Sequence, residues 1–508
     1  MQSLKLRKCY TAFLVLTFLV IPLTMVSAGS HSLLFDPSIC SAPITETWYG
    51  KEVTYRACEN IVYVSNPVDT NYQKMNIYIP ETYYEGGFIN GYTAKTAPIF
   101  FPMTVGGYFS GPPATVATES VRYALLNGYV VAAPGARGHD IKNADGLWTG
   151  KAPACIVDVK AAVRYLRHND KRMPGDAEKI ITNGTSASGA LSSLLGATGN
   201  NKDYEPYLKA IGAAEARDDI FAASCYCPIQ NLDNADTAME WQFNNIYFVG
   251  PPTFPTTEEQ DVISDDLKAM FPAYLNSLRL RVPDHRSCNN KHHKKGTVLT
   301  LDEDGEGNFK DYVKSFVIAS AQKFMEESGI IPEFDWITRE GTIVTDIDFY
   351  GFSAEPTYPG RLPFKLPPAF DALGLGSFEN QLFGTATIAQ QHFTQYGYAN
   401  STAGATLADP KIVKMMNPTY YIGKKGSTIA QYWRIRHGTI DHHTSLAIPV
   451  ILATMLENNG YDVDFALPWE RDHGGDYDLF ALFAWIDRIA DPGRDCGGHH
   501  KHCGDHHD

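Results

Sequence analysis

The sequence has no long apolar run after its first 28 residues. A membrane-spanning helix needs about 20 consecutive apolar residues, so we expect none in that part of the chain. Basic residues are also in the minority, because 43 Lys and Arg stand against 57 Asp and Glu and give a formal net charge of −14. Such an acidic surface argues against nucleic acid or an anionic membrane as a partner.

The first residues differ from the rest of the chain. Lys5, Arg7 and Lys8 precede an apolar run over 12–26, and residues 26–28 then place small side chains at the −3 and −1 positions. This order is typical of a cleaved secretory signal peptide over 1–28, which predicts a secreted or periplasmic protein without a membrane contact after cleavage. The alternative is an uncleaved anchor, although the apolar run is short for a spanning helix.

Cysteine is rare, with 9 in 508 residues, and an even number remains after the predicted signal. An exported protein of this kind permits disulfides, although their connectivity does not follow from the sequence. The first pairs to test are the local ones, Cys40 with Cys58 and Cys496 with Cys503. Cys225 and Cys227 stand in an apolar run and fit buried thiols.

A nucleophile elbow is the strongest motif in the chain. A β-branched run over 180–182 meets a Gly-x-Ser turn at Gly184 and Ser186, and small residues at helical spacing follow at once. In such an elbow a strand, a tight turn and a helix expose one serine hydroxyl above a parallel sheet. We therefore predict Ser186 as the nucleophile. The fifth motif position is Ser188 instead of glycine, so Ser188 is the weaker alternative.

A glycine pair precedes the elbow and predicts an oxyanion hole. Gly106 and Gly107 come directly after an apolar run over 98–103. Glycines at this place let a backbone N–H approach the substrate, and the N–H of Ala187 at the helix start would supply the second donor. The alternative is that the glycines only mark a turn.

Strand and helix patterns alternate through the first half of the chain. We expect strands at 61–65, 75–79, 98–103, 130–133, 180–182 and 220–226, and helices at 118–126, 153–168 and from 187. This alternation predicts an α/β fold with a mostly parallel central sheet and helices on both faces.

The same pattern resumes near the C-terminus and supplies an acid and a base. Asp441 follows a strand over 432–438, and His473 follows the last strand, which we place at 462–468. The order Ser186, Asp441, His473 matches the order serine, acid, histidine of α/β-hydrolases. Nearby alternatives for these roles are Asp462, Asp464, Asp472, Asp476, His437 and His442.

These patterns divide the chain into four parts, of which the predicted signal peptide over 1–28 is the first. The core of the α/β-hydrolase covers 29–230 and 413–492, and a lid insertion covers 231–412, where the alternation stops. An acidic loop over 302–311 resembles the start of a calcium site, but Val313 stands where a bidentate Glu should be, so we favour a plain turn. The tail, 493–508, is rich in His and Cys and could bind a metal or form a disulfide.

Three stretches together resemble the bacterial tannases (tannin acyl hydrolases). They are Gly-Thr-Ser-Ala-Ser-Gly-Ala-Leu from 184 with its continuation to 200, Trp-Arg-Ile-Arg-His-Gly from 433 with Asp441, and 464–476. The likeness covers most of the chain from the strand near Asn76 to the last helix. It implies an α/β-hydrolase with a large lid inserted before the triad acid, which cleaves galloyl esters to gallic acid and an alcohol.

The resemblance also implies substrate-binding residues. The family holds the galloyl hydroxyls with a lysine and a glutamate of the lid, which Lys365 and Glu379 match here, and with an acid two positions after the triad acid. This last position is His443 in the present chain. An ammonium donates to phenolic oxygens, a carboxylate accepts from phenolic hydroxyls, and a neutral imidazole can accept one hydrogen bond.

The sequence therefore predicts a serine esterase that acts on galloyl or related hydroxybenzoate esters through an acyl-enzyme, with no cofactor and no catalytic metal. The substrate is a small phenolic ester. A feruloyl-type or general carboxylesterase uses the same triad and remains an alternative, as does a serine peptidase. A non-catalytic binding protein with a hydrolase fold is the alternative from a different class.

Overall fold

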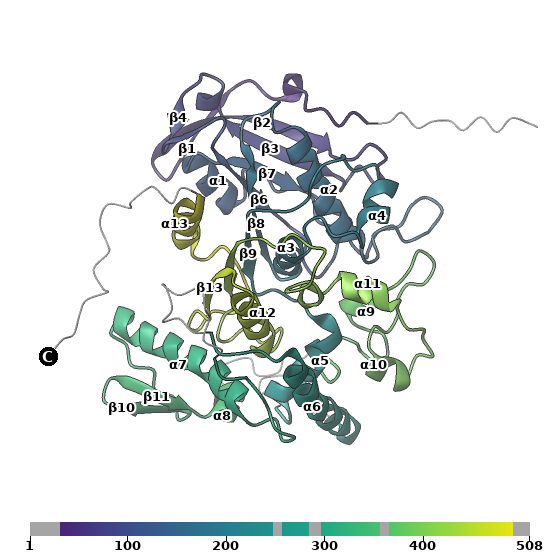
Figure 1. The fold of residues 1–508 in the computed structure, drawn as a ribbon, viewed down its shortest axis with the longest axis vertical. Helices are drawn as coiled ribbons and strands as arrows, with labels where there is room; N and C mark the ends of the chain where they lie inside the picture. The colour runs from purple at the N-terminus through teal and green to yellow at the C-terminus, as the bar shows by residue number, and fades with distance from the viewer. Residues whose placement is uncertain (1–30, 247–256, 284–295, 356–364, 491–508) are drawn as a thin grey trace, which may run out of the picture.

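A computed structural model of the chain describes residues 31–246, 257–283, 296–355 and 365–490 (Figure 1). The predicted signal peptide and the His- and Cys-rich tail lie outside the described residues, and so do Cys288, Cys496 and Cys503. Among the described residues, no helix is long and apolar enough to cross a membrane.

A nine-stranded sheet forms the centre of the molecule, in the order β1-β2-β3-β7-β6-β8-β9-β12-β13. Its strands from β7 to β13 pair in parallel, whereas β1, β2, β3 and β7 pair antiparallel. The bounds are β1 (Ile44–Trp48), β2 (Lys51–Val62), β3 (Lys74–Pro80), β6 (Pro98–Pro102), β7 (Val130–Pro134), β8 (Asp176–Thr185), β9 (Ala222–Tyr226), β12 (Tyr432–Arg436) and β13 (Asp462–Ala466). The predicted α/β class with a mostly parallel sheet is confirmed.

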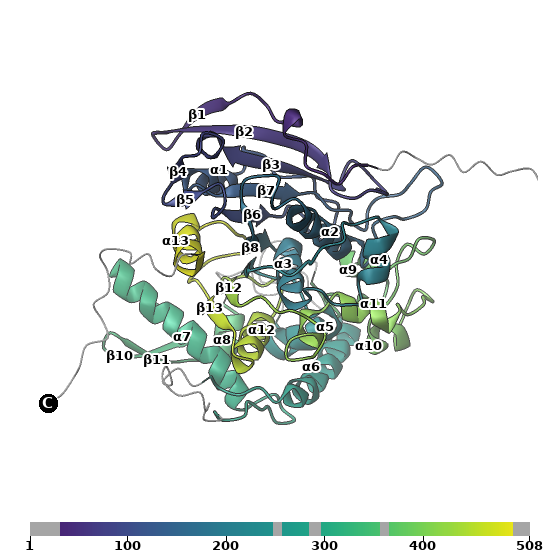
Figure 2. The ribbon, with the colours of Figure 1, turned by 45° about the horizontal axis from the view of Figure 1, so that its top comes forward.

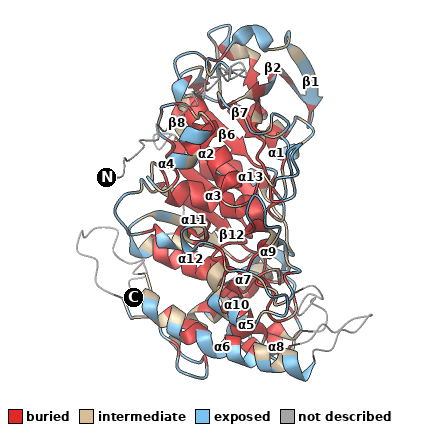
Figure 3. Cartoon of the chain, turned by 90° about the vertical axis from the view of Figure 1, so that its right-hand side faces the viewer, coloured by how far each residue is buried: buried red, intermediate tan, exposed pale blue. Residues whose placement is uncertain are grey.

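Composition explains why the central strands take these places. Every residue of β6, β7 and β9 is buried, and these strands are continuous runs of apolar and small residues. Strands of this type suit a parallel sheet, because helices cover both of its faces. Figure 3 shows the buried residues concentrated along the sheet and the helices that flank it.

Five helices pack on the sheet. They are α1 (Glu119–Leu126), α2 (Ala154–His168), α3 (Ala187–Ala197), α12 (Ala447–Asn458) and α13 (Leu479–Ala490). In the packed structure α1 contacts α13, and α2 contacts α3. Figure 2 shows these two pairs on different sides of the sheet. Of these, α1, α2 and α3 lie where the sequence predicted helices, within a few residues at each predicted end.

A long insertion separates β9 from β12, in the place where the sequence predicted a lid. Its helices are α5 (Leu232–Phe243), α6 (Glu258–Leu278), α7 (Asn308–Ser328), α8 (Phe349–Ser353), α9 (Phe378–Leu382), α10 (Gln395–Ala399) and α11 (Pro410–Met415), with a hairpin of β10 (Ile337–Glu340) and β11 (Ile343–Ile347). In Figure 1 α5 to α8 and the hairpin lie below the end of the sheet that carries β13, whereas α9, α10 and α11 lie to the right of α12. The domain limits 231–412 stay a prediction.

The N-terminal edge of the sheet carries a disulfide. Cys40 bonds to Cys58 of β2 across 18 residues of chain, as one of the two local pairings predicted. Cys155, Cys225 and Cys227 are buried free thiols. The acidic loop is a turn in which the Asp302 carboxylate accepts the N–H groups of Asp304 and Glu306.

Candidate active site

The turn after β8 holds Ser186 in a strained conformation. Its φ of 60° and ψ of −120° lie outside the regions that residues with a side chain normally occupy. Neighbouring glycines make the turn possible, because a Cβ at 184 would lie 2.4 Å from the Ser188 carbonyl oxygen and one at 189 would lie 2.5 Å from the Tyr226 carbonyl oxygen. Strain of this kind costs on the order of 1–3 kcal/mol and persists at functional sites.

Ser188 is part of the same turn but is already engaged. It is buried, and both its N–H and its hydroxyl donate to the carbonyl oxygen of Val105, at 3.0 and 2.8 Å. These bonds join the start of α3 to the loop that carries Gly106 and Gly107. A serine at the fifth motif position therefore fits the turn, and its side chain faces the loop instead of the cavity described below.

Asp441 and His473 form a hydrogen-bonded pair on the loops after β12 and β13. The His473 Nδ1 lies 2.8 Å from Asp441 Oδ2, and the other carboxylate oxygen accepts the N–H of His443 at 3.0 Å. Burial raises the pKa of Asp441, but the nearby His437 and the bond to His473 outweigh it, so the pKa lies below its usual value. This carboxylate is therefore ionised and fixes one face of the imidazole.

Two of the other candidate acids have other partners, and a third, Asp472, accepts the backbone N–H of His473 at 2.6 Å. Asp464 pairs with Arg436 at 2.8 Å, and Asp476 accepts from the Asn183 amide at 2.8 Å. Among the described residues, neither of these two carboxylates is hydrogen-bonded to the His473 ring, whose Nδ1 faces Asp441. Within the described residues, the Ser186 hydroxyl makes no hydrogen bond to His473, a contact that in many hydrolases tightens only when substrate binds.

One cavity of about 460 Å³ brings most of the predicted site residues together. Its walls contain Ser186, Ala187, Gly107, His473, Lys365, Glu379 and His443. Sequence reasoning did not include its apolar wall, which Tyr108, Ile229, Ala369 and Phe378 contribute. The only local signals for these residues are that Tyr108 follows the glycine pair and that Phe378 precedes Glu379.

The glycine pair is only partly in the cavity wall. Gly107 lines the cavity with a φ of 55°, and its carbonyl oxygen lies 3.2 Å from His139 Nε2. Gly106 lies just behind it, where its carbonyl accepts the N–H of Phe109. Ala187 is the first residue of α3, and an N–H at the first position of a helix has no acceptor within the helix. Backbone of two segments, at Gly107 and at Ala187, thus lines the cavity that contains Ser186.

Lys365 and Glu379 are both buried in the wall opposite the elbow, at 7% and 6% exposure. The Lys365 Nζ lies 3.8 Å from Glu379 Oε1, 3.5 Å from the centre of the Phe370 ring and 3.4 Å from the Ala369 carbonyl oxygen. Burial lowers the pKa of Lys365, and the charge of Glu379 opposes this effect. The amino group of Lys365 and the carboxyl group of Glu379 therefore stand side by side in the cavity wall.

The His443 ring stacks on the ring of His473, the predicted catalytic base. The ring centres of His443 and His473 are 3.9 Å apart, with 16° between the planes. The pKa of His443 is lowered to about 4, chiefly by burial and then by the nearby His473 and Lys365, while Asp441 and Asp472 oppose this effect. His443 is therefore a neutral imidazole at physiological pH, whereas an acidic residue at this position would carry a negative charge.

Two buried carboxylates hold the lid segment that carries Lys365 and Glu379. Asp236 of α5 accepts the N–H groups of Phe370 and Asp371 at 2.7 and 2.9 Å. The Asp371 carboxylate accepts from the Asn380 amide at 2.7 Å, and Asn380 belongs to α9 beside Glu379. A helix of the insertion thus holds the Phe370–Asp371 backbone, which lies between the two charged residues in the chain.

Comparison with known proteins gives one consistent group. A family model described as BD-FAE matches residues 90–238, and a comparison with curated proteins found no match. Among solved structures, the tannase of Fusobacterium nucleatum is 46% identical, with a TM-score of 0.83, over 90% of this chain and 99% of that chain. A tannin acyl hydrolase in complex with 3,4-dihydroxybenzoate is 45% identical with a TM-score of 0.84, and one in complex with ethyl gallate is 44% identical with 0.82, both at the same coverage.

Proposed function

Because the chain belongs to the bacterial tannase family, we propose that it hydrolyses galloyl and related hydroxybenzoate esters through an acyl-enzyme on Ser186. The cavity carries this proposal, since it joins the strained serine, the imidazole and the paired charges of Lys365 and Glu379. The solved relatives with 3,4-dihydroxybenzoate and ethyl gallate support a phenolic acyl group.

The chemistry follows from the positions of the three side chains. The Ser186 hydroxyl attacks the ester carbonyl carbon, and its proton passes to Nε2 of His473 while Asp441 stabilises the resulting imidazolium. The tetrahedral oxyanion receives hydrogen bonds from the N–H groups of Ala187 and of the Gly106–Gly107 segment. The bond to the alcohol oxygen then breaks, and His473 returns the proton to this leaving group. Water repeats the steps on the acyl-enzyme and releases the phenolic acid.

The lid residues select the phenolic acyl group. The Lys365 ammonium donates to ring oxygens and the Glu379 carboxylate accepts from ring hydroxyls, and both bonds are strong because the groups are charged. His443 offers a neutral ring nitrogen as acceptor instead of an acid. We therefore propose that the enzyme depends less on the full set of three hydroxyls than a site with a second carboxylate would.

Hydrolysis of three methyl esters tests the assignment. We expect kcat/KM for methyl gallate and methyl 3,4-dihydroxybenzoate to exceed the value for methyl ferulate, whose methoxy group cannot donate to Glu379. Ser186→Ala is the control for adventitious hydrolysis. A preference for methyl ferulate would reject the galloyl assignment and favour the feruloyl-type esterase. Cleavage of peptides but not of aryl esters would favour the peptidase.

A labelling experiment tests whether the protein is an enzyme at all. A serine-directed fluorophosphonate should label the protein and fail to label Ser186→Ala. Labelling of neither form would favour a binding protein.

We also propose that the protein is exported, to the periplasm or the medium, because its Cys40–Cys58 disulfide suits an oxidising compartment. Finding the intact, unprocessed chain in the cytoplasm of the producing cell would contradict export.

A further inference from the structure

Cys227 lies directly behind the catalytic pair, although the reaction does not use it. It follows β9, which stands in the sheet between β8, the strand of the nucleophile, and β12, the strand that leads to Asp441. It is buried, with a φ of 34°, and its N–H donates to the Arg436 carbonyl oxygen at 2.6 Å. Its thiol donates to the Gly474 carbonyl oxygen at 3.3 Å, next to His473 in the chain. The sheet order therefore fixes this thiol beside both catalytic loops.

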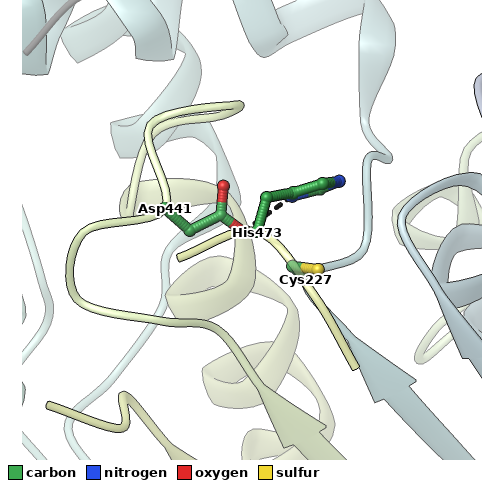
Figure 4. A group of neighbouring side chains, drawn as sticks. All are labelled: Cys227, Asp441 and His473. Atoms are coloured by element: carbon green, nitrogen blue, oxygen red, sulfur yellow. Dashed lines mark hydrogen bonds and ion pairs between the residues drawn. The ribbon is translucent and has the colours of Figure 1, made fainter. Parts of the chain in front are cut away.

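Three metal-binding side chains meet at this place. One ligand atom each from Cys227, Asp441 and His473 lies within 4.8 Å of the other two. Figure 4 shows the three side chains together, with the hydrogen bond between Asp441 and His473 and the thiol beside them. Sulfur, carboxylate oxygen and imidazole nitrogen are the ligands that zinc prefers, at about 2.0–2.3 Å from the ion. Tetrahedral geometry at such bond lengths puts ligand atoms roughly 3.5 Å apart. Atoms as far as 4.8 Å apart must therefore approach by about 1.3 Å, while the Asp441 and His473 atoms, now 2.8 Å apart, must separate by about 0.7 Å.

We propose that Cys227, Asp441 and His473 form an inhibitory site for zinc and other thiophilic divalent cations. Three protein ligands with water in the fourth position is a common zinc arrangement. Magnesium and calcium prefer oxygen ligands, so they do not compete for a site that contains a thiolate.

Inhibition follows from the two nitrogens of one imidazole. The ion binds Nδ1 of His473, the atom that faces Asp441, and replaces the hydrogen bond between them. The Cys227 thiol gives its proton to water, and the ring hydrogen moves from Nδ1, which now binds the ion, to Nε2. The nitrogen that must accept the Ser186 proton then has no free lone pair, and hydrolysis stops while the ion is bound. Removal of the ion restores the original tautomer.

Zinc inhibition of matched variants tests the site. We expect zinc to inhibit the chelator-treated full chain, and Cys227→Ala to raise the half-inhibitory concentration by at least about tenfold, as loss of metal-site contacts commonly does. Each variant is compared with its own activity without zinc. Cys225→Ala is the matched control, because Cys225 is also a buried thiol at the end of β9 but outside the cluster. Equal inhibition of wild type and Cys227→Ala would overturn the proposal, and so would equal inhibition by magnesium.

A binding measurement keeps the test independent of hydrolysis. Cobalt(II) bound to a thiolate absorbs in the near ultraviolet by charge transfer, so the full chain with Ser186→Ala should show this band. Adding Cys227→Ser, which preserves the size of the side chain, should weaken this band relative to the chain with Ser186→Ala alone. Cys496 and Cys503 are present in both proteins, so any contribution from them cancels in the difference spectrum. An unchanged spectrum would overturn the site even if the ester preference proved wrong.

Discussion

At the scale of single residues, Asp441 gives the sharpest test of the catalytic pair. Asp441→Asn preserves the shape of the site but places an amide against His473 Nδ1, which favours the wrong imidazole tautomer. We expect kcat with methyl gallate to fall by about 10⁴-fold, the scale such a change has in serine hydrolases. Asp464→Asn is the matched control, because Asp464 pairs with Arg436. If Asp464→Asn caused the larger loss, Asp441 would not be the catalytic acid.

His443 should make the folded state sensitive to acid. Burial lowers its pKa to about 4 from 6.5, so between these values the unfolded chain binds more protons than the native chain. Stability from the neutral ring is complete above pH 6.5 and is lost as the pH falls toward 4. His443→Gln should therefore reduce the drop in the urea midpoint between pH 6.5 and 4.5, while the neighbouring His473, Asp441 and Lys365 are present in both forms. A parallel drop in the variant would show that His443 is not buried as a neutral ring.

Sequence reasoning found the polar residues of the cavity but neither its apolar wall nor all of the contacts. Ser186 was predictable because a local turn with flanking glycines specifies it, and Asp441 and His473 because each follows a strand in the expected order. The stacking of His443 on His473 and the bond of Ser188 to Val105 were not predictable. Both depend on how side chains of separate segments pack, which neither spacing nor composition records.

At the scale of elements, we expect the insertion to position the substrate through the contacts of α5 with the Phe370–Asp371 backbone. Asp236→Asn leaves an amide that can accept from only one side, so α5 holds the Phe370–Asp371 backbone less firmly. We expect KM for methyl gallate to rise about tenfold, which corresponds to about 1.4 kcal/mol, with a smaller change in kcat. Hydrolysis of p-nitrophenyl acetate, which has no ring hydroxyl to place, serves as the control. An equal loss with both esters would point to general unfolding.

The same scale shows where sequence patterns succeed and where they fail. Continuous apolar runs predicted β6, β7 and β9, which are buried on both faces. The pattern at 61–65 identified only the end of β2, and β1 was missed. These strands lie at the edge of the sheet and alternate polar with apolar residues, so their signal is weak. α6 was also missed, because Pro272 stands inside it and interrupts the helical pattern.

At the scale of the whole molecule, the order of the strands explains why distant residues converge. β8, β12 and β13 run parallel and end at the same edge of the sheet, with β9 between the first two. Ser186, Asp441 and His473 follow these three ends, so their meeting is a property of the α/β class that sequence order predicts. The limits of the lid stay a prediction, because an insertion has no repeating pattern that fixes where it rests.

The disulfide and the catalytic loops lie in different parts of the sheet, so the disulfide should affect the stability of the fold without affecting catalysis. Cys40–Cys58 closes 18 residues of chain at β2, whereas the catalytic loops follow strands from the other half of the sheet order. Reduction of this disulfide should lower the free energy of unfolding by about 3 kcal/mol, through the greater freedom of the unfolded chain. We expect a lower thermal midpoint with an unchanged kcat at temperatures well below it, measured by calorimetry and methyl gallate hydrolysis. A double variant, Cys40→Ser with Cys58→Ser, should show the lower midpoint and no further response to reductant. A fall in kcat on reduction of the folded wild type, without a matching fall in the double variant, would instead place a redox-sensitive group next to the triad.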